Sequence, residues 1–98
     1  MYAVSFDIDT NFLNKHYPQE TYHNAYNDIR KFMEGNGFEW QQGSMYFGQP
    51  DRITAVTCVT VMQQMAKHFA WFKTCVKDIR MLRIEENNDL MSAVLIVD

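Results

Sequence analysis

The chain begins with the stretch YAVSFDID, residues 2–9, and this stretch decides the fold. Apolar side chains stand at the even positions from Tyr2 to Ile8, and smaller or polar side chains stand at the odd positions between them. This alternation has the period of a strand that buries one face. The sequence therefore predicts a first strand over residues 2–8, with Asp7 and Asp9 at its end.

The later segments follow the same kinds of rule. An apolar repeat of 3.6 residues predicts two amphipathic helices, the first placed between Pro18 and the Gly-Asn-Gly of residues 35–37. Short aromatic runs on both sides of Gln42-Gly43 predict a tight antiparallel hairpin. In chain order, we expect a strand over 2–8, a helix over 19–34, strands over 38–41 and 44–47, a helix over 54–69 and a strand over 79–85.

The order strand, helix, strand, strand, helix, strand is that of an α+β, ferredoxin-like βαββαβ sandwich with two helices on one sheet face. No linker or repeat interrupts residues 1–98, so we expect a single domain. The tail from Leu90 to Val97 is almost wholly apolar and needs a cover. We expect it to form an extra strand that docks on the sheet of a second copy in a homodimer.

Composition limits the possible functions. The chain has 98 residues, 47% of them hydrophobic, and a net charge of −3, so any contact with a nucleic acid requires a local patch or a bridging metal. Its two cysteines form no CxxC pair, and no export signal or run of roughly 20 apolar residues is visible. We expect a cytoplasmic protein without a membrane partner. Nucleotide-binding glycine motifs and zinc-protease motifs do not occur in the sequence.

The strongest candidates for chemistry are Asp7 and Asp9. If the strand stays extended, both carboxylates leave the face that the helices do not cover. In a dimer formed across that face, Asp7 and its symmetry mate could share a cation or a proton and assist phosphodiester cleavage. The simpler alternative is that Asp7, Asp9 and Asn11 only end the strand and begin a turn.

Basic and aromatic residues offer a candidate RNA surface. Lys77, Arg80 and Arg83, with Lys73 nearby, concentrate positive charge that could hold an RNA backbone, or they could form a solvated face balanced by neighbouring acids. The hairpin aromatics could stack bases, although such clusters are more often core, and the sequence does not match the RRM consensus. These hairpin aromatics are Trp40, Tyr46 and Phe47. The three histidines, His16, His23 and His68, show no metal-ligand spacing and are expected to be ordinary surface residues.

Four ordered blocks of sequence carry a family resemblance. They are Phe6-Asp7-Ile8-Asp9-Thr10-Asn11, Asn24-Ala25-Tyr26-Asn27-Asp28-Ile29-Arg30, Gly37-Phe38-Glu39-Trp40-Gln41-Gln42-Gly43-Ser44 and Cys75-Val76-Lys77-Asp78-Ile79-Arg80. With these blocks the chain resembles the virulence-associated protein D (VapD) family over nearly everything from Met1 to Asn88. The segment from Leu90 to Asp98 departs from the shared pattern.

The resemblance implies a ferredoxin-like dimer related to the small CRISPR-associated nucleases, with endoribonuclease activity and a toxin role that a protein antitoxin counters. Carried over residue by residue, it implies Asp7, Ser44 and Tyr46 as catalytic residues. We expect Asn11 and the basic patch to bind the RNA, and Asp7 to position a divalent cation such as Mg²⁺ or Mn²⁺. The rivals are metal-free attack by the RNA 2′-hydroxyl and a non-catalytic RNA-binding or protein-interaction dimer.

Overall fold

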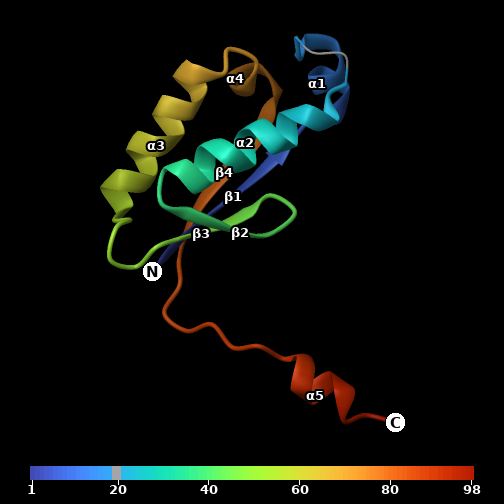
Figure 1. Ribbon diagram of the computed structural model, residues 1–98, viewed down its shortest axis with the longest axis vertical. Coiled ribbons are helices and arrows are strands. Elements are labelled where there is room, and N and C mark those ends of the chain that lie inside the picture. The colour runs from blue at the N-terminus through green and yellow to red at the C-terminus, as the bar shows by residue number, and fades with distance from the viewer. Residues whose placement is uncertain (19–20) are drawn as a thin grey trace.

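A computed structural model describes residues 1–18 and 21–98, and it has one antiparallel sheet with helices packed on one of its faces (Figure 1). The elements in chain order are β1 (Tyr2–Ile8), α1 (Thr10–His16), α2 (His23–Gly35), β2 (Phe38–Gln42), β3 (Met45–Gly48), α3 (Ala55–His68), α4 (Phe72–Cys75), β4 (Val76–Arg83) and α5 (Met91–Leu95). The predicted α+β class and the order of its four strands are confirmed.

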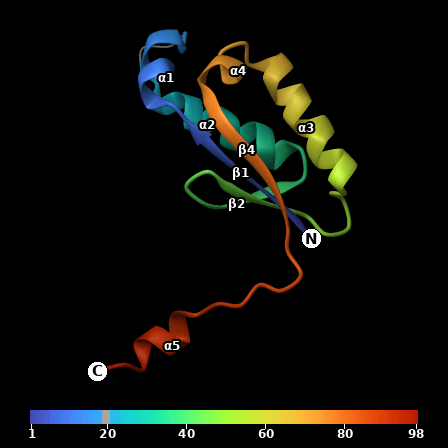
Figure 2. The ribbon, with the colours of Figure 1, turned by 180° about the vertical axis from the view of Figure 1, so that it is seen from behind.

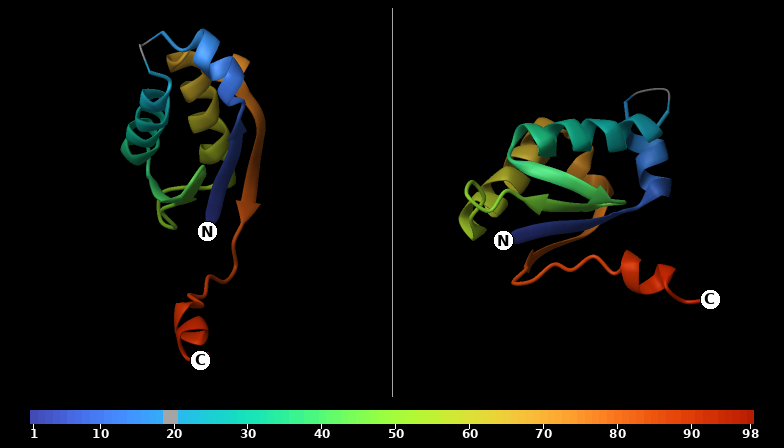
Figure 3. Two further views of the ribbon diagram at one scale, coloured as in Figure 1. Left: turned by 90° about the vertical axis from the view of Figure 1, so that its right-hand side faces the viewer. Right: turned by 60° about the horizontal axis from the view of Figure 1, so that its bottom comes forward.

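The sheet has the order β2-β3-β1-β4, so β1 lies inside it between β3 and β4. All three neighbouring pairs are antiparallel, as in the ferredoxin-like plan. Helices α2 and α3 lie on the same side of the sheet, and among the described residues no helix packs against the other side (Figures 2 and 3). The predicted open face is therefore present.

Strand register assigns each side chain to a face. Val4 and Phe6 point toward the helices and are almost fully buried, whereas Asp7 points to the open side and is exposed. The core between the helices and the sheet includes Leu13, Ile29 and Met65. Alternation along β1 therefore sets which face carries the acid, as the sequence predicts.

Helix α1 was not predicted. Asp9 caps it: the side chain accepts the backbone N–H of Asn11 at 3.0 Å and of Phe12 at 3.2 Å. Only Leu13 of this short helix is buried, so the apolar periodicity that identifies longer helices is absent. Pro18 follows the end of α1 and does not open α2, which begins at His23; the predicted start at residue 19 lies outside the described residues.

Smaller differences concern the later elements. The short helix α4 was also unpredicted, and β4 begins at Val76, three residues before the predicted start, because Lys77 and Asp78 look like turn residues in the sequence. In α3 the apolar residue Val59 is 52% exposed, whereas Val61 is buried. The helix itself begins as predicted, with Thr54 accepting the backbone N–H of Thr57.

The tail differs most from the prediction. The extra strand expected over Leu90 to Val97 is not formed in this chain, because Met91–Leu95 make a short helix that stands away from the domain (Figure 1). Its apolar side chains are largely exposed, Leu95 by 74% and Ile96 by 82%. Among residues 1–18 and 21–98, no helix is long and apolar enough to span a membrane.

Candidate active site at the end of the first strand

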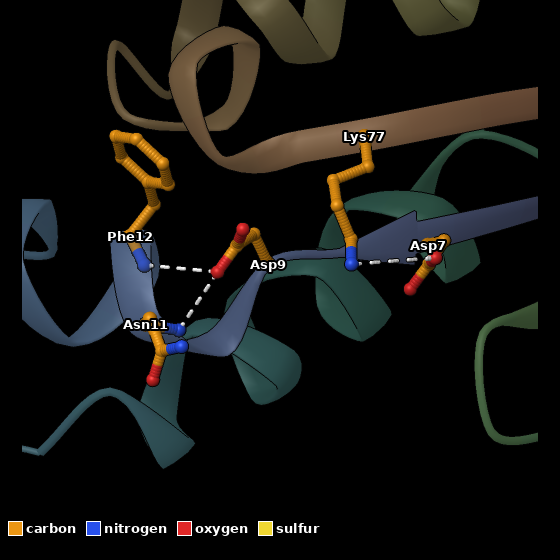
Figure 4. Close-up of polar contacts among 5 residues, drawn as sticks. All are labelled: Asp7, Asp9, Asn11, Phe12 and Lys77. Atoms are coloured by element: carbon orange, nitrogen blue, oxygen red, sulfur yellow. Dashed lines mark hydrogen bonds and ion pairs between the residues drawn. The ribbon is translucent and has the colours of Figure 1, made fainter.

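Asp7 stands at the end of β1 on the open face, with 67% of its side chain exposed. The register between β1 and β4 shifts between Asp7 and Ile8, which face Asp78 and Val76. This bulge leaves Lys77 without a direct partner on β1, and its Nζ lies 3.9 Å from Asp7 Oδ2 (Figure 4). β-Bulges commonly redirect side chains in this way.

A second carboxylate lies beside the first. Asp78 is the cross-strand partner of Asp7, and directly opposed residues project from the same face. Arg80 Nε donates to both oxygens of Asp78 at 3.0 Å, so the group contains two acids and two bases. Within the described part of the chain, no cluster of three or more His, Cys, Asp or Glu residues could hold a metal ion. One chain therefore supplies at most this pair of carboxylates.

Asp9 does not join Asp7. The strand ends at Ile8, and the Asp9 carboxylate turns to the first amides of α1, as Figure 4 shows. The strand does not stay extended through Asp9, so the two acids do not leave the same face; Asp9 ends the strand, as the simpler alternative held, but it begins a helix and not a turn. Asn11 lies exposed in the first turn of α1, just beyond this end of the strand.

The predicted basic patch is divided between two faces. Arg80 pairs with Ser5 across the strands and lies on the open side with Asp7, while Arg83 pairs with Tyr2 and lies on the helix side. Arg83 also forms an ion pair with Glu85 at 3.2 Å. Only Lys77 and Arg80 therefore accompany Asp7.

Tyr46 and Ser44 lie differently from each other. Tyr46 pairs with Val4, faces the helices and stacks on Phe6 at a centroid distance of 5.7 Å, so it stands on the sheet face opposite to Asp7. Burial raises the pKa of Tyr46 to about 12. Ser44 is closer to the acid, because its carbonyl accepts the backbone N–H of Phe6 at 3.2 Å. The structure thus brings Ser44 near the end of β1 and keeps Tyr46 in the core.

The hairpin aromatics are also split. Phe47 pairs with Ala3 on the open face, whereas Trp40 pairs with Tyr46 on the helix side. There Trp40 borders a pocket beneath α2 that sequence analysis missed, although two of its polar residues, Asn27 and Arg30, lie in one of the four family blocks. Their spacing of three on one helix was the available signal.

Comparison with known proteins agrees with this architecture. A family profile described as "CRISPR associated protein Cas2" matches residues 1–91. A protein of Helicobacter pylori named "Endoribonuclease VapD homolog" is 59% identical over 97 residues, covering 99% of each chain. "Endoribonuclease VapD 2" of Riemerella anatipestifer is 58% identical over 96% of this chain and 99% of its own, and "Endoribonuclease VapD" of Dichelobacter nodosus is 37% identical over 96% and 97%.

The matches extend over the elements that form the sheet, both covering helices and the acidic strand end. Identity of this level over nearly the whole of both chains is far above what a shared fold alone requires. The chain belongs to the VapD family, within the wider family of Cas2-type proteins.

Proposed function

We propose that this protein is an endoribonuclease that uses Asp7 to cleave RNA phosphodiester bonds. The single observation that carries the proposal is the exposed Asp7 carboxylate on the open sheet face, beside Asp78 and Lys77. The names of the relatives, all endoribonucleases of the VapD type, support the same substrate class. RNA can reach this acid because neither α2 nor α3 covers that face.

The proposed mechanism uses the two opposed carboxylates as ligands of a divalent cation, Mg²⁺ or Mn²⁺. Such ions take oxygen ligands, and they bind one or two carboxylates together with substrate phosphates and water. When bound, the cation supplies charge stabilisation at the scissile phosphate. Asp7 would hold the cation together with Asp78, whose carboxylate would exchange its contact with Arg80 for the cation. Lys77, whose Nζ lies 3.9 Å from Asp7 Oδ2, balances the negative charge of the two acids.

The RNA backbone then runs along the β4 side of the open face. Arg80 projects from the same face as Asp7, and Asn11 extends the polar surface past the end of the strand. Each phosphate held by a lysine or arginine makes binding weaker as salt increases. Ser44 acts by fixing the hairpin to β1, since its main-chain carbonyl binds Phe6.

A time course on a defined single-stranded RNA, with and without a chelator, tests this function. We expect the protein to cut the RNA, Asp7→Asn to stop cutting, and the chelator to stop it as well. Asp51→Asn is the matched control, because Asp51 is an exposed aspartate in the turn after β3. A rate that the chelator leaves unchanged would select metal-free attack by the 2′-hydroxyl. Absence of cutting with preserved RNA affinity would select a binding module.

We further propose that two copies associate through the open face. Across β3, β1 and β4 this face carries Phe47, Ala3 and Leu82 in one row, and a lone chain leaves Leu82 41% exposed and Phe47 half-buried, although Ala3 between them is covered. A two-fold interface there would bring the Asp7 residues of both copies toward one axis. The tail stands off this same face, and the open cleft between them is lined by Met45 and Phe47 of β3 and by Leu90, Met91 and Val94 of the tail.

A toxin role in the cytoplasm, countered by a protein antitoxin, is the physiological setting that we propose, as the resemblance to the VapD family implies. Induced expression in a bacterial host tests it. We expect the parent protein to arrest growth and Asp7→Asn to leave growth unchanged. Equal growth with both forms, at equal protein levels, would exclude a toxin that acts through this site.

A further inference from the structure

A pocket of about 320 Å³ lies on the helix-covered side of the sheet, between α2 and the β2–β3 hairpin. Known ligand sites begin at about 300 Å³, so it is large enough for one small group. The pocket is separate from the open-face acids. Its lining combines aromatic rings with a cation and polar groups: Phe6, Tyr26, Asn27, Ile29, Arg30, Trp40, Gly43, Ser44 and Tyr46.

Contacts within the protein fix the positions of the Trp40 and Arg30 side chains at this pocket. Trp40 Nε1 donates to the carbonyl of Gly43 at 2.9 Å, which fixes the indole, and the side chain is 38% exposed. The Arg30 guanidinium lies over the ring, 4.4 Å from its centroid. Its Nε pairs with Glu34 at 3.3 Å, which uses one of the five N–H donors of the guanidinium.

The pocket is close to the acid of the proposed active site. Phe6, which precedes Asp7 on β1, forms part of its wall, and the Ser44 carbonyl binds the Phe6 N–H. Burial raises the pKa of Tyr26, and the charges of Tyr22 and Asp7 raise it further. The Tyr26 hydroxyl is therefore within electrostatic range of the Asp7 carboxylate. The pocket and Asp7 therefore lie at the same end of β1 on opposite faces of the sheet, and an RNA chain that passes around this strand end meets both.

We infer that the pocket holds one nucleotide of the RNA next to the scissile phosphate, with its base against Trp40 and Tyr26 and its phosphate on Arg30. Aromatic planes and arginine guanidinium groups are the surfaces on which unpaired bases stack, and guanidinium binds phosphate through paired N–H donors. Asn27 and Ser44 offer donors and acceptors for a base edge. This inference deepens the proposed endoribonuclease function and rests on it.

Equilibrium binding of a fluorescently labelled single-stranded RNA of eight nucleotides tests the inference in an Asp7→Asn background, where the RNA stays intact. Trp40→Ala and Arg30→Gln should each raise Kd about five- to a hundredfold, the loss typical of one stacked base or one charge-assisted contact. Trp40→Phe, which keeps a stacking ring, should lose less. The matched control is Lys31→Gln, which removes one exposed charge from the neighbouring position of α2 and should change Kd less than twofold.

The outcomes separate the pocket from the cleavage site. If Trp40→Ala and Arg30→Gln bind as tightly as the parent, or if no form binds RNA, the inference is overturned. Arg30 is exposed, so its variant remains informative even where Trp40→Ala fails to fold. RNA that is bound through the pocket but never cut would retain the inference and reject the endoribonuclease. If the pocket variants bind RNA as tightly as the parent while cutting still depends on Asp7, the endoribonuclease is retained and the pocket inference is rejected.

Discussion

Asp7 and Asp9 are two residues apart on one segment, yet the structure gives them different surroundings. Asp9 accepts two backbone amides of α1, while Asp7 is exposed beside Lys77 on the open face. A carboxylate that caps a helix contributes to stability, and an exposed one with a neighbouring base contributes little. The two acids can therefore be distinguished by mutation.

Asp9→Ala should lower the free energy of unfolding by about 1 kcal/mol, because the cap of α1 is lost. Urea denaturation measures this change. Asp9→Asn, whose side-chain oxygen can still cap, should remain close to the parent in stability and in RNA cleavage. If Asp9→Asn kept full stability but lost cleavage, Asp9 would belong to the chemistry and not to the helix.

Two buried tyrosines make the stability of the folded protein fall at alkaline pH. Burial and a 2.6 Å hydrogen bond from the Tyr17 hydroxyl to Asp28 raise the pKa of Tyr17 to about 12, and burial raises that of Tyr46 to about 12. A folded pKa above the ordinary 10.0 favours folding below that pH, and the gain disappears as pH rises from 10 to 12. Urea midpoints should fall across this window, and less steeply in Tyr17→Phe. A midpoint that stays constant to pH 12 would contradict it.

At the scale of elements, sequence periodicity predicted the strands and helices that bury one face against the core. Strands β1 and β3 and helix α3 each bury a face that repeats along the chain, so their positions are visible in the sequence. Helix α1 buries only Leu13, and α4 has four residues, so neither repeats long enough to be recognised. The apolar tail is ambiguous for the same reason, since a short apolar run suits helix and strand alike.

The candidate site was predictable only in part. Asp7 follows from its place in the strand, but Lys77 reaches it through a bulge, and Asp78 faces it because of cross-strand register. Register and bulges join distant segments and leave no local pattern in the sequence. The pocket residues Arg30 and Trp40 likewise meet only after α2 packs on the hairpin.

Two glycines in different elements should respond oppositely to alanine. A Cβ at Gly48 in β3 would meet Ile53 Cγ2 at 2.7 Å and Ile53 Cβ at 2.8 Å, so Gly48→Ala should cost about 1–3 kcal/mol of unfolding free energy. At Gly35, at the end of α2, a Cβ meets nothing within 4 Å, and Gly35→Ala should gain about 0.5–1 kcal/mol. Thermal unfolding of both variants measures the difference. Equal changes in stability for the two variants would show that the Ile53 side chain moves aside without cost.

At the scale of the whole molecule, one face of a thin sheet is covered by helices, and the other carries the apolar row of Phe47, Ala3 and Leu82 as well as the acidic strand end. The uncovered face thus joins the proposed association surface to the proposed cleavage site. A second copy on that face would protect Phe47 and Leu82 from water and bring two copies of Asp7 together.

Sedimentation at micromolar concentration tests this arrangement. We expect the parent to be a dimer and Phe47→Glu to be a monomer, because the substitution places a charge in the middle of the open face. Val56→Glu is the control: Val56 is 75% exposed on α3, on the helix side, and its variant should remain dimeric. A monomeric parent would exclude the dimer.

The most direct measurement pairs RNA cleavage with unfolding free energy in one preparation of Asp7→Asn. Asp7 is exposed and lies opposite a second acid, so we expect the unfolding free energy to stay within about 0.5 kcal/mol of the parent while cleavage is abolished. Cleavage at the parental rate by the folded variant would contradict the assignment of the chemistry to Asp7.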